Sequence, residues 1–138
     1  MKKGPLNGVK IVDVSSILMV PYCTRILADL GADVIKIETL EGDNTRYIGP
    51  SVNKGMGAVF LNLNRNKKSI SVNLKTKEGK EIIHKLISRS DIFVSNIRKS
   101  ALERLGFTHK NFKTSRGRGF THKSFKSSRG RGFTHKKC

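Results

Sequence analysis

Four short segments of the chain alternate between hydrophobic and polar residues: residues 9–14, 33–38, 69–74 and 91–96. A period of two predicts β-strands, because successive side chains of a strand point to opposite faces. Residues 39–57 are rich in Gly, Asn and Pro and predict a long loop. The stretch "AVFLNLN" that follows this loop fits a short helix and a strand equally well.

Two longer segments carry hydrophobic residues at helical spacing. The first begins near Pro21, which suits a first helical turn, and stops at Gly31, which suits a helix end. The second follows Thr76, a residue type that caps helix starts. Its hydrophobic residues should share one face: Ile82, Ile83, Leu86 and Ile87. The stretch "SALERLGF" predicts one more short helix, ending at Gly106.

The order of these elements predicts the fold class. Strand, helix and strand follow one another twice, which indicates parallel βαβ units and an α/β fold with a doubly wound parallel sheet. Ligands of such sheets bind at the carboxyl ends of the strands. Those ends are the candidate site region: residues 15–20, 39–44, 75 and 96–99.

Several familiar sites are missing from this pattern. The segment "DVSSILMVPY" after the first strand has no glycine, so it lacks the G-x-G-x-x-G pattern of a nicotinamide site. We also find no Walker A motif and no His/Cys grouping with the spacing of a metal site.

Charge divides the chain into two parts. Residues 1–107 carry 18 Lys+Arg against 10 Asp+Glu, a formal charge of +8, and are moderately basic, as nucleotide-binding domains often are. Residues 108–138 carry 10 Lys+Arg and no acid, and "GFTHK" recurs every 13 residues near this end. We expect this part to be a disordered basic tail that sticks to polyanions non-specifically. Its Arg-Gly pairs and phenylalanines also fit a nucleic-acid-binding segment.

The two cysteines, Cys23 and Cys138, do not form a disulfide framework. We expect Cys23 and its neighbour Tyr22 to pack in the core, and His84 to lie exposed on its helix. No stretch has the length of an apolar membrane span, and the start "MKKGPLNG" does not resemble a secretory signal. We therefore expect a cytoplasmic protein. A mitochondrial location is the alternative, but the sequence shows no clear presequence for it.

Several segments of the chain resemble those of a known family. The segment "PLNGVKIVDVSSILMVPYCTRILADLGADVIKIE" is similar to the start of the family III CoA-transferases, also called CaiB/BaiF-like. This family includes formyl-CoA and carnitine CoA-transferases and 2-methylacyl-CoA racemases. The resemblance continues through "NRNKKS", "SDIFVSN" and "ALERLGF" and covers residues 5 to about 108.

The resemblance implies a Rossmann-like α/β domain, of which residues 1–107 would be the amino-terminal part, and interlocked homodimers. It also implies coenzyme A or an acyl-CoA as a substrate, with no permanently bound cofactor, and transfer of CoA from an acyl-CoA to a carboxylic acid. The implied CoA-binding residues are Ser16, Ile17, Leu18, Met19, Val72, Asn73, Leu74, Lys75, Asn96, Ile97, Arg98 and Arg104. The residue types agree, because cations at strand ends suit phosphates and apolar side chains suit adenine and pantetheine.

Two departures from the family pattern concern function. Many members have Arg where this chain has Thr39, and the loss of that cation would weaken a phosphate contact by about 1–3 kcal/mol. The family's catalytic aspartate follows the "RLGF" block, whereas the last acid here is Glu103. We therefore assign no catalytic residue and expect this chain alone, as a truncated CoA-transferase, to be inactive.

Three hypotheses remain open from the sequence. The chain is the CoA-binding part of a CoA-transferase, or a non-catalytic module that binds CoA or pairs with a full-length homologue. In the third hypothesis it is a nucleic-acid-binding protein that acts through residues 108–138.

Overall fold

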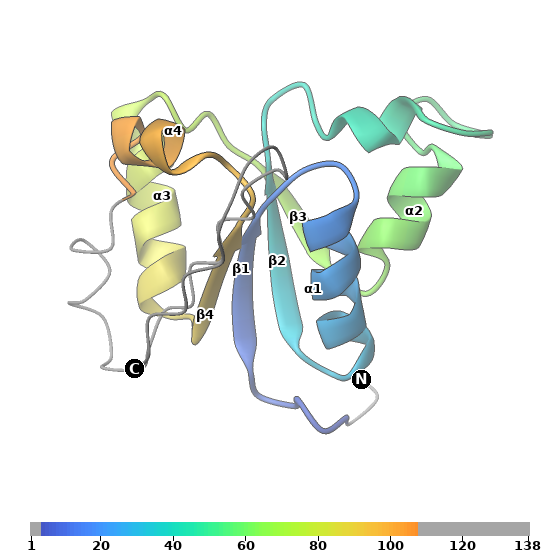
Figure 1. Cartoon of the computed structure of the whole chain (residues 1–138), viewed down its shortest axis with the longest axis horizontal. Coiled ribbons are helices and arrows are strands. Elements are labelled where there is room, and N and C mark those ends of the chain that lie inside the picture. Colours follow the sequence, from blue (N-terminus) through green and yellow to red (C-terminus); the bar gives the residue numbers. More distant parts are fainter. Residues whose placement is uncertain (1–3, 108–138) are drawn as a thin grey trace, which may run out of the picture.

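The computed structural model describes residues 4–107, which form one parallel β-sheet flanked by helices (Figure 1). The predicted basic tail of residues 108–138 lies outside the described residues. In chain order the elements are β1 (Lys10–Val14), α1 (Met19–Asp29), β2 (Asp33–Glu38), a 3-10 helix (Asn44–Tyr47), α2 (Ala58–Asn64), β3 (Lys68–Ser71), α3 (Lys77–Ser88), β4 (Ile92–Ser95) and α4 (Lys99–Arg104).

The four strands lie in the order β3-β2-β1-β4, and every pair is parallel. Helices α1 and α2 lie on one side of the sheet and α3 and α4 on the other (Figure 1). This arrangement confirms the predicted α/β fold with a parallel sheet. The ambiguous stretch "AVFLNLN" is the helix α2, in which Phe60 and Leu63 are buried at helical spacing.

The larger core lies between the sheet and helices α3 and α4. Alternate strand residues such as Val12 and Phe93 meet Ile83 and Ile87 of α3 there. The prediction that Ile82 belongs to the same face is wrong, because its position on the helix turns it outward and it is 45% exposed. The prediction of an exposed His84 is also wrong, since its half-buried ring lies 5.3 Å from that of Phe107.

The opposite side of the sheet has a small apolar core near the amino ends of the strands. Ile11 and Val34 pack there against Ala28 of α1. Helix α1 turns Pro21, Thr24 and Ala28 toward the sheet, so residues between them lie outside. The predicted core packing of Tyr22 and Cys23 is therefore wrong, because both are exposed.

The connection from β3 to α3 begins earlier than the sequence suggested. The strand ends at Ser71 rather than at Leu74, and the backbone N–H of Thr76 donates to the carbonyl of Asn73, 3.3 Å away, in a turn. The hydroxyl of Thr76 accepts from the N–H of Gly79 at 3.1 Å, which confirms the predicted cap. A Cβ on Gly79 would lie 2.0 Å from the Asn73 carbonyl oxygen, so only glycine permits this close turn.

Candidate functional site

The residues predicted to bind a ligand lie at the carboxyl ends of three strands. Ser16–Met19 follow β1, Val72–Lys75 follow β3, and Asn96–Arg98 follow β4. Arg104 lies on α4, directly beyond the β4 group. Because the strands are parallel, all of these groups share one edge of the sheet. The first and third groups are neighbours, since β1 pairs with β4, whereas the β3 group is separated from them by β2.

The loop after β1 presents a hydrophobic surface to solvent. Ile17 and Leu18 are each about half exposed, and Met19 is 75% exposed. Ile17 has a φ of 70°, in the left-handed region that a β-branched residue rarely adopts. The backbone therefore holds the side chains of Ile17, Leu18 and Met19 outward, and it does so with a positive φ that is unfavourable for isoleucine.

Not every predicted residue faces outward. Val72 is buried in the core beneath α3 and α4, and Leu74 and Ile97 pack against the same core. Val72, Leu74 and Ile97 are therefore less accessible to a ligand than Met19. Asn73 accepts the backbone N–H of Lys75 through its side-chain oxygen, at 3.0 Å, and so stabilises the turn after β3.

Three exposed cations remain at this edge: Lys75, Arg98 and Arg104. None of the three makes an ion pair within residues 4–107. Lys99 differs, since its Nζ lies 3.9 Å from a carboxylate oxygen of Glu103. Cations without a protein carboxylate are available to an anionic ligand such as a phosphate.

Asn96 joins two of the predicted groups directly. Its Oδ1 accepts the backbone N–H of Ser16 at 3.2 Å, and its Nδ2 donates to the carbonyl of Ser16 at 2.8 Å. The side chain of one predicted ligand residue is therefore engaged by the backbone of another.

A buried polar network lies beneath the edge, on the α1 side of the sheet. Lys36 is fully buried and its Nζ donates to the carbonyl of Ser15 at 2.8 Å and pairs with Asp43 at 2.9 Å. Asp13 accepts from the hydroxyl of Thr24 at 2.5 Å and pairs with Lys67 at 3.2 Å. Burial lowers the pKa of Lys67 below its usual value, although the Asp13 carboxylate opposes this.

Asp43 also accepts from Thr45. Its Oδ1 takes the backbone N–H at 2.9 Å and the hydroxyl at 2.7 Å. Burial alone would raise the pKa of Asp43, but hydrogen bonds from Lys36 and Thr45 outweigh it, and the pKa lies below its usual value. The carboxylate is therefore held in its charged form beneath the edge.

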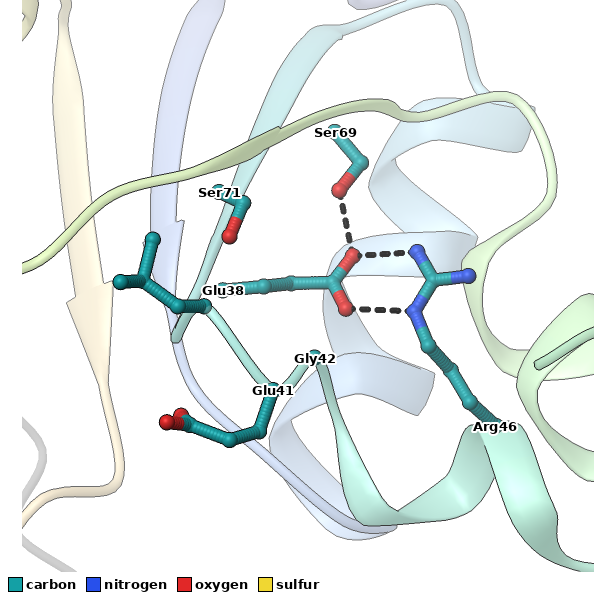
Figure 2. A pocket seen from close by; sticks show the side chains of 7 residues that line it. Glu38, Glu41, Gly42, Arg46, Ser69 and Ser71 are labelled. Atoms are coloured by element: carbon teal, nitrogen blue, oxygen red, sulfur yellow. Dashed lines mark hydrogen bonds and ion pairs between the residues drawn. The ribbon is translucent and has the colours of Figure 1, made fainter.

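A shallow pocket of about 240 Å³ opens at the ends of β2 and β3 (Figure 2). Glu38 lies on its wall and accepts two parallel bonds from Arg46, at 2.7 and 2.8 Å, and one from the hydroxyl of Ser69. Burial would raise the pKa of Glu38, but these bonds outweigh it and lower the pKa. Glu41 also lines the pocket, so its wall is acidic and does not favour a phosphate.

The basic segment "NRNKKS" is used inside the protein. Arg65 donates to Asp29 of α1 at 2.7 Å, Lys67 pairs with Asp13 of β1, and Lys68 pairs with Asp33 at 2.7 Å. These cations link helix α1 and the strands through ion pairs. Sequence reasoning missed this role because the charges of the segment are visible in the sequence and their partners are not.

The described residues offer neither a metal cluster nor a membrane-spanning helix. Within residues 4–107, no group of three or more His, Cys, Asp or Glu side chains is arranged to hold a metal ion. Among the helices that the structure describes, none is both long enough and apolar enough to span a membrane.

Comparison with known proteins gives a consistent result. The sequence model of CoA-transferase family III matches residues 6–118. The chain is 46% identical over 112 residues to (R)-2-hydroxy-4-methylpentanoate CoA-transferase of Clostridioides difficile, covering 78% of this chain and 28% of that protein. It is 43% identical over 110 residues to formyl-CoA:oxalate CoA-transferase of Escherichia coli O6:H1, covering 79% of this chain and 26% of that protein.

Solved structures agree with these sequence matches. A CAIB/BAIF family protein from Brucella suis superposes with a TM-score of 0.80 at 34% identity, covering 88% of this chain and 33% of the other. A hypothetical protein from Mycobacterium tuberculosis superposes with a TM-score of 0.76 at 28% identity, covering 86% and 32%. The chain thus spans about a quarter to a third of the length of the relatives it matches.

Proposed function

Because the chain belongs to CoA-transferase family III, we propose that the carboxyl edge of its sheet binds coenzyme A and CoA thioesters. In this proposal the chain supplies the CoA-binding part of a reaction that moves CoA from an acyl-CoA to a carboxylic acid. The acyl groups named for the relatives are properties of those proteins.

The proposal rests on one observation: cations without an ion-pair partner and exposed apolar residues occur together at the carboxyl edge of the sheet. CoA joins a phosphorylated adenosine to a less polar pantetheine arm, so it needs both kinds of contact. Lys75, Arg98 and Arg104 offer cations, and Ile17 and Met19 offer apolar surface. The helices α1 and α3 also begin at this edge, where their N-termini favour negative charge.

The individual roles follow from position. Arg98 lies two residues after Asn96, whose side chain contacts Ser16 after β1, so it would bind a phosphate near that loop. Thr39, directly after β2, stands where many family members have Arg; its hydroxyl donates to the carbonyl of Gly42 at 3.2 Å, so it would bind a phosphate more weakly.

The chemical step needs a carboxylate that attacks the thioester. The most buried carboxylates of the described residues, Asp13, Glu38 and Asp43, are each held in an ion pair with Lys or Arg. We therefore propose that the 138-residue polypeptide binds CoA and does not transfer it. Pairing with a second copy or with a longer homologue stays a prediction.

Isothermal titration calorimetry of the full chain with CoA tests the proposal. We expect Arg98→Ala to weaken binding about 10- to 100-fold, the usual effect of one charge-assisted hydrogen bond. Lys85→Ala is the matched control, because Lys85 is an exposed cation in the last turn of α3, at the opposite edge of the sheet. Equal affinities for the two variants would contradict the assignment of the site.

An acyl-exchange assay tests the second half of the proposal. Purified chain, an acyl-CoA and labelled CoA should give no exchange above the rate without protein. Exchange that depends on the protein would mean that one of its own carboxylates acts as the nucleophile.

A further inference from the structure

The side chain of Asn96 takes the place of a backbone peptide. The last paired residues of β1 and β4 are Val14 and Ser95, so Asn96 and Ser16 lie beyond the ladder. Asn96 nevertheless accepts from the N–H of Ser16 and donates to its carbonyl, at 3.2 and 2.8 Å. An amide side chain has the same donor and acceptor as a peptide group. It therefore extends the pairing between β1 and β4 by one residue.

The residue after this contact adopts an unfavourable backbone conformation. Ile17 has a φ of 70°, and a β-branched side chain in the left-handed region persists only when its surroundings impose it. The side chain of Ile17 is half exposed, so the core does not supply that constraint. The Ser16 carbonyl, which accepts from Asn96, belongs to the peptide bond directly before Ile17.

A second contact fixes the same strand end from below. The Nζ of Lys36 donates to the carbonyl of Ser15 at 2.8 Å, and Lys36 is itself held by Asp43 at 2.9 Å. The chain is thus held at Ser15 by a buried cation and at Ser16 by an exposed amide. Beyond these two points, residues 17–19 project into solvent.

We propose that Asn96 is a positioning residue for the CoA site, and that its side chain holds the β1 loop ready for CoA instead of binding the ligand. This rests on the proposed function. The amide keeps Ile17, Leu18 and Met19 in the outward arrangement before CoA arrives, so that less ordering is needed on binding. Its side-chain oxygen and nitrogen are both already engaged by Ser16.

The test compares Asn96→Ala with Asn62→Ala in the full chain. Asn62 is a matched control, because it is also exposed and accepts one bond from another element, from Arg25 at 3.0 Å. If loss of the contact between Asn96 and Ser16 leaves the loop in its binding conformation about one tenth of the time, the apparent Kd for CoA rises about tenfold. Asn62→Ala should leave the Kd unchanged.

Amide hydrogen exchange in the absence of CoA separates positioning from direct contact. Asn96→Ala should make the Ser16 amide exchange several-fold faster, about as fast as a solvent-exposed amide, while core amides such as that of Val12 stay protected. A higher Kd with an unchanged Ser16 amide would overturn the proposal and make Asn96 a direct ligand. A general loss of protection in the core would overturn it in favour of a merely structural role.

A second variant tests the link to Ile17. Glycine adopts positive φ readily, so in an Ile17→Gly background the conformation of the loop depends less on the contact between Asn96 and Ser16. The change in Kd caused by Asn96→Ala should then be clearly smaller than in the native background, and an equal change would contradict the proposal. If the unaltered chain bound no CoA, the proposed function would be wrong, and the Ser16 exchange rates would still decide whether Asn96 holds the loop.

Discussion

Replacement of Lys36 by methionine tests the buried network under the edge. The side chain of Lys36 is 1% exposed and that of its partner Asp43 is 2% exposed, so water cannot replace the lost partner. Methionine keeps most of the apolar length of lysine and removes the charge. It leaves the Asp43 carboxylate buried with the two hydrogen bonds from Thr45 and without its ion-pair partner.

The expected cost follows from these contacts. Removal of one partner of a buried ion pair destabilises proteins by about 3–5 kcal/mol. The bonds from Thr45 place Lys36→Met near the lower end, at about 3 kcal/mol. With a urea m value of about 1–3 kcal/mol/M, the unfolding midpoint should fall by about 1–3 M.

Urea unfolding followed by circular dichroism measures this effect. The double variant Lys36→Met/Asp43→Asn should recover about half of the loss, because the amide oxygen keeps the bonds from Thr45 and no charge stays buried. Lys10→Met is the control: Lys10 is an exposed strand residue, so its loss should change the stability by less than about 0.5 kcal/mol. A Lys36→Met cost below about 1 kcal/mol, or a double variant less stable than the single one, would refute the reasoning.

Two further predictions concern the same fold. The pKa values of Glu38 and Asp43 lie below their ordinary values of 4.5 and 3.8, so their ion pairs stabilise the fold fully above these values. The urea midpoint should therefore fall as the pH drops below about 4.5 and through the lowered pKa values, and a midpoint constant down to pH 2 would contradict this. Ile83→Ala should cost about 2–4 kcal/mol and Ile82→Ala less than about 1 kcal/mol, because Ile83 is fully buried and Ile82 is 45% exposed. Equal urea midpoints for these two variants would show that the core assignment is wrong.

The strands β1, β2 and β4 lie within one residue of their predicted ends, whereas β3 is mostly exposed and ends at Ser71 rather than at Leu74. The predicted range Asp33–Glu38 is β2 as observed, and the predicted end of β1 at Val14 is also observed. The helix α2 was ambiguous because only tertiary contacts decide it. Its Phe60 lies beneath the guanidinium of Arg46, 3.7 Å from the ring centre, and Arg46 belongs to the preceding 3-10 helix.

The position of the candidate site could be predicted, and its internal contacts could not. Parallel topology places the carboxyl ends of the strands at one edge, as the sequence suggested, and the observed strand order makes β1 and β4 neighbours there. The contact between Ser16 and Asn96 joins residues 80 positions apart and depends on side-chain geometry. Asp13 and Lys36 give a visible signal, since a charged residue inside a buried strand needs a partner. Which residue serves as that partner depends on how α1 and the loop after β2 fold over the sheet.

Titration of the isotope-labelled full chain with CoA, followed residue by residue through its backbone amide resonances, shows most directly whether CoA binds at the carboxyl edge of the sheet. We expect saturable shifts at residues 16–19 and 96–98, at this edge, and none at Lys10, Asp33 or Ile92, where the strands begin. Saturable shifts centred on the strand beginnings, or no shifts at millimolar CoA with a well-folded protein, would contradict it.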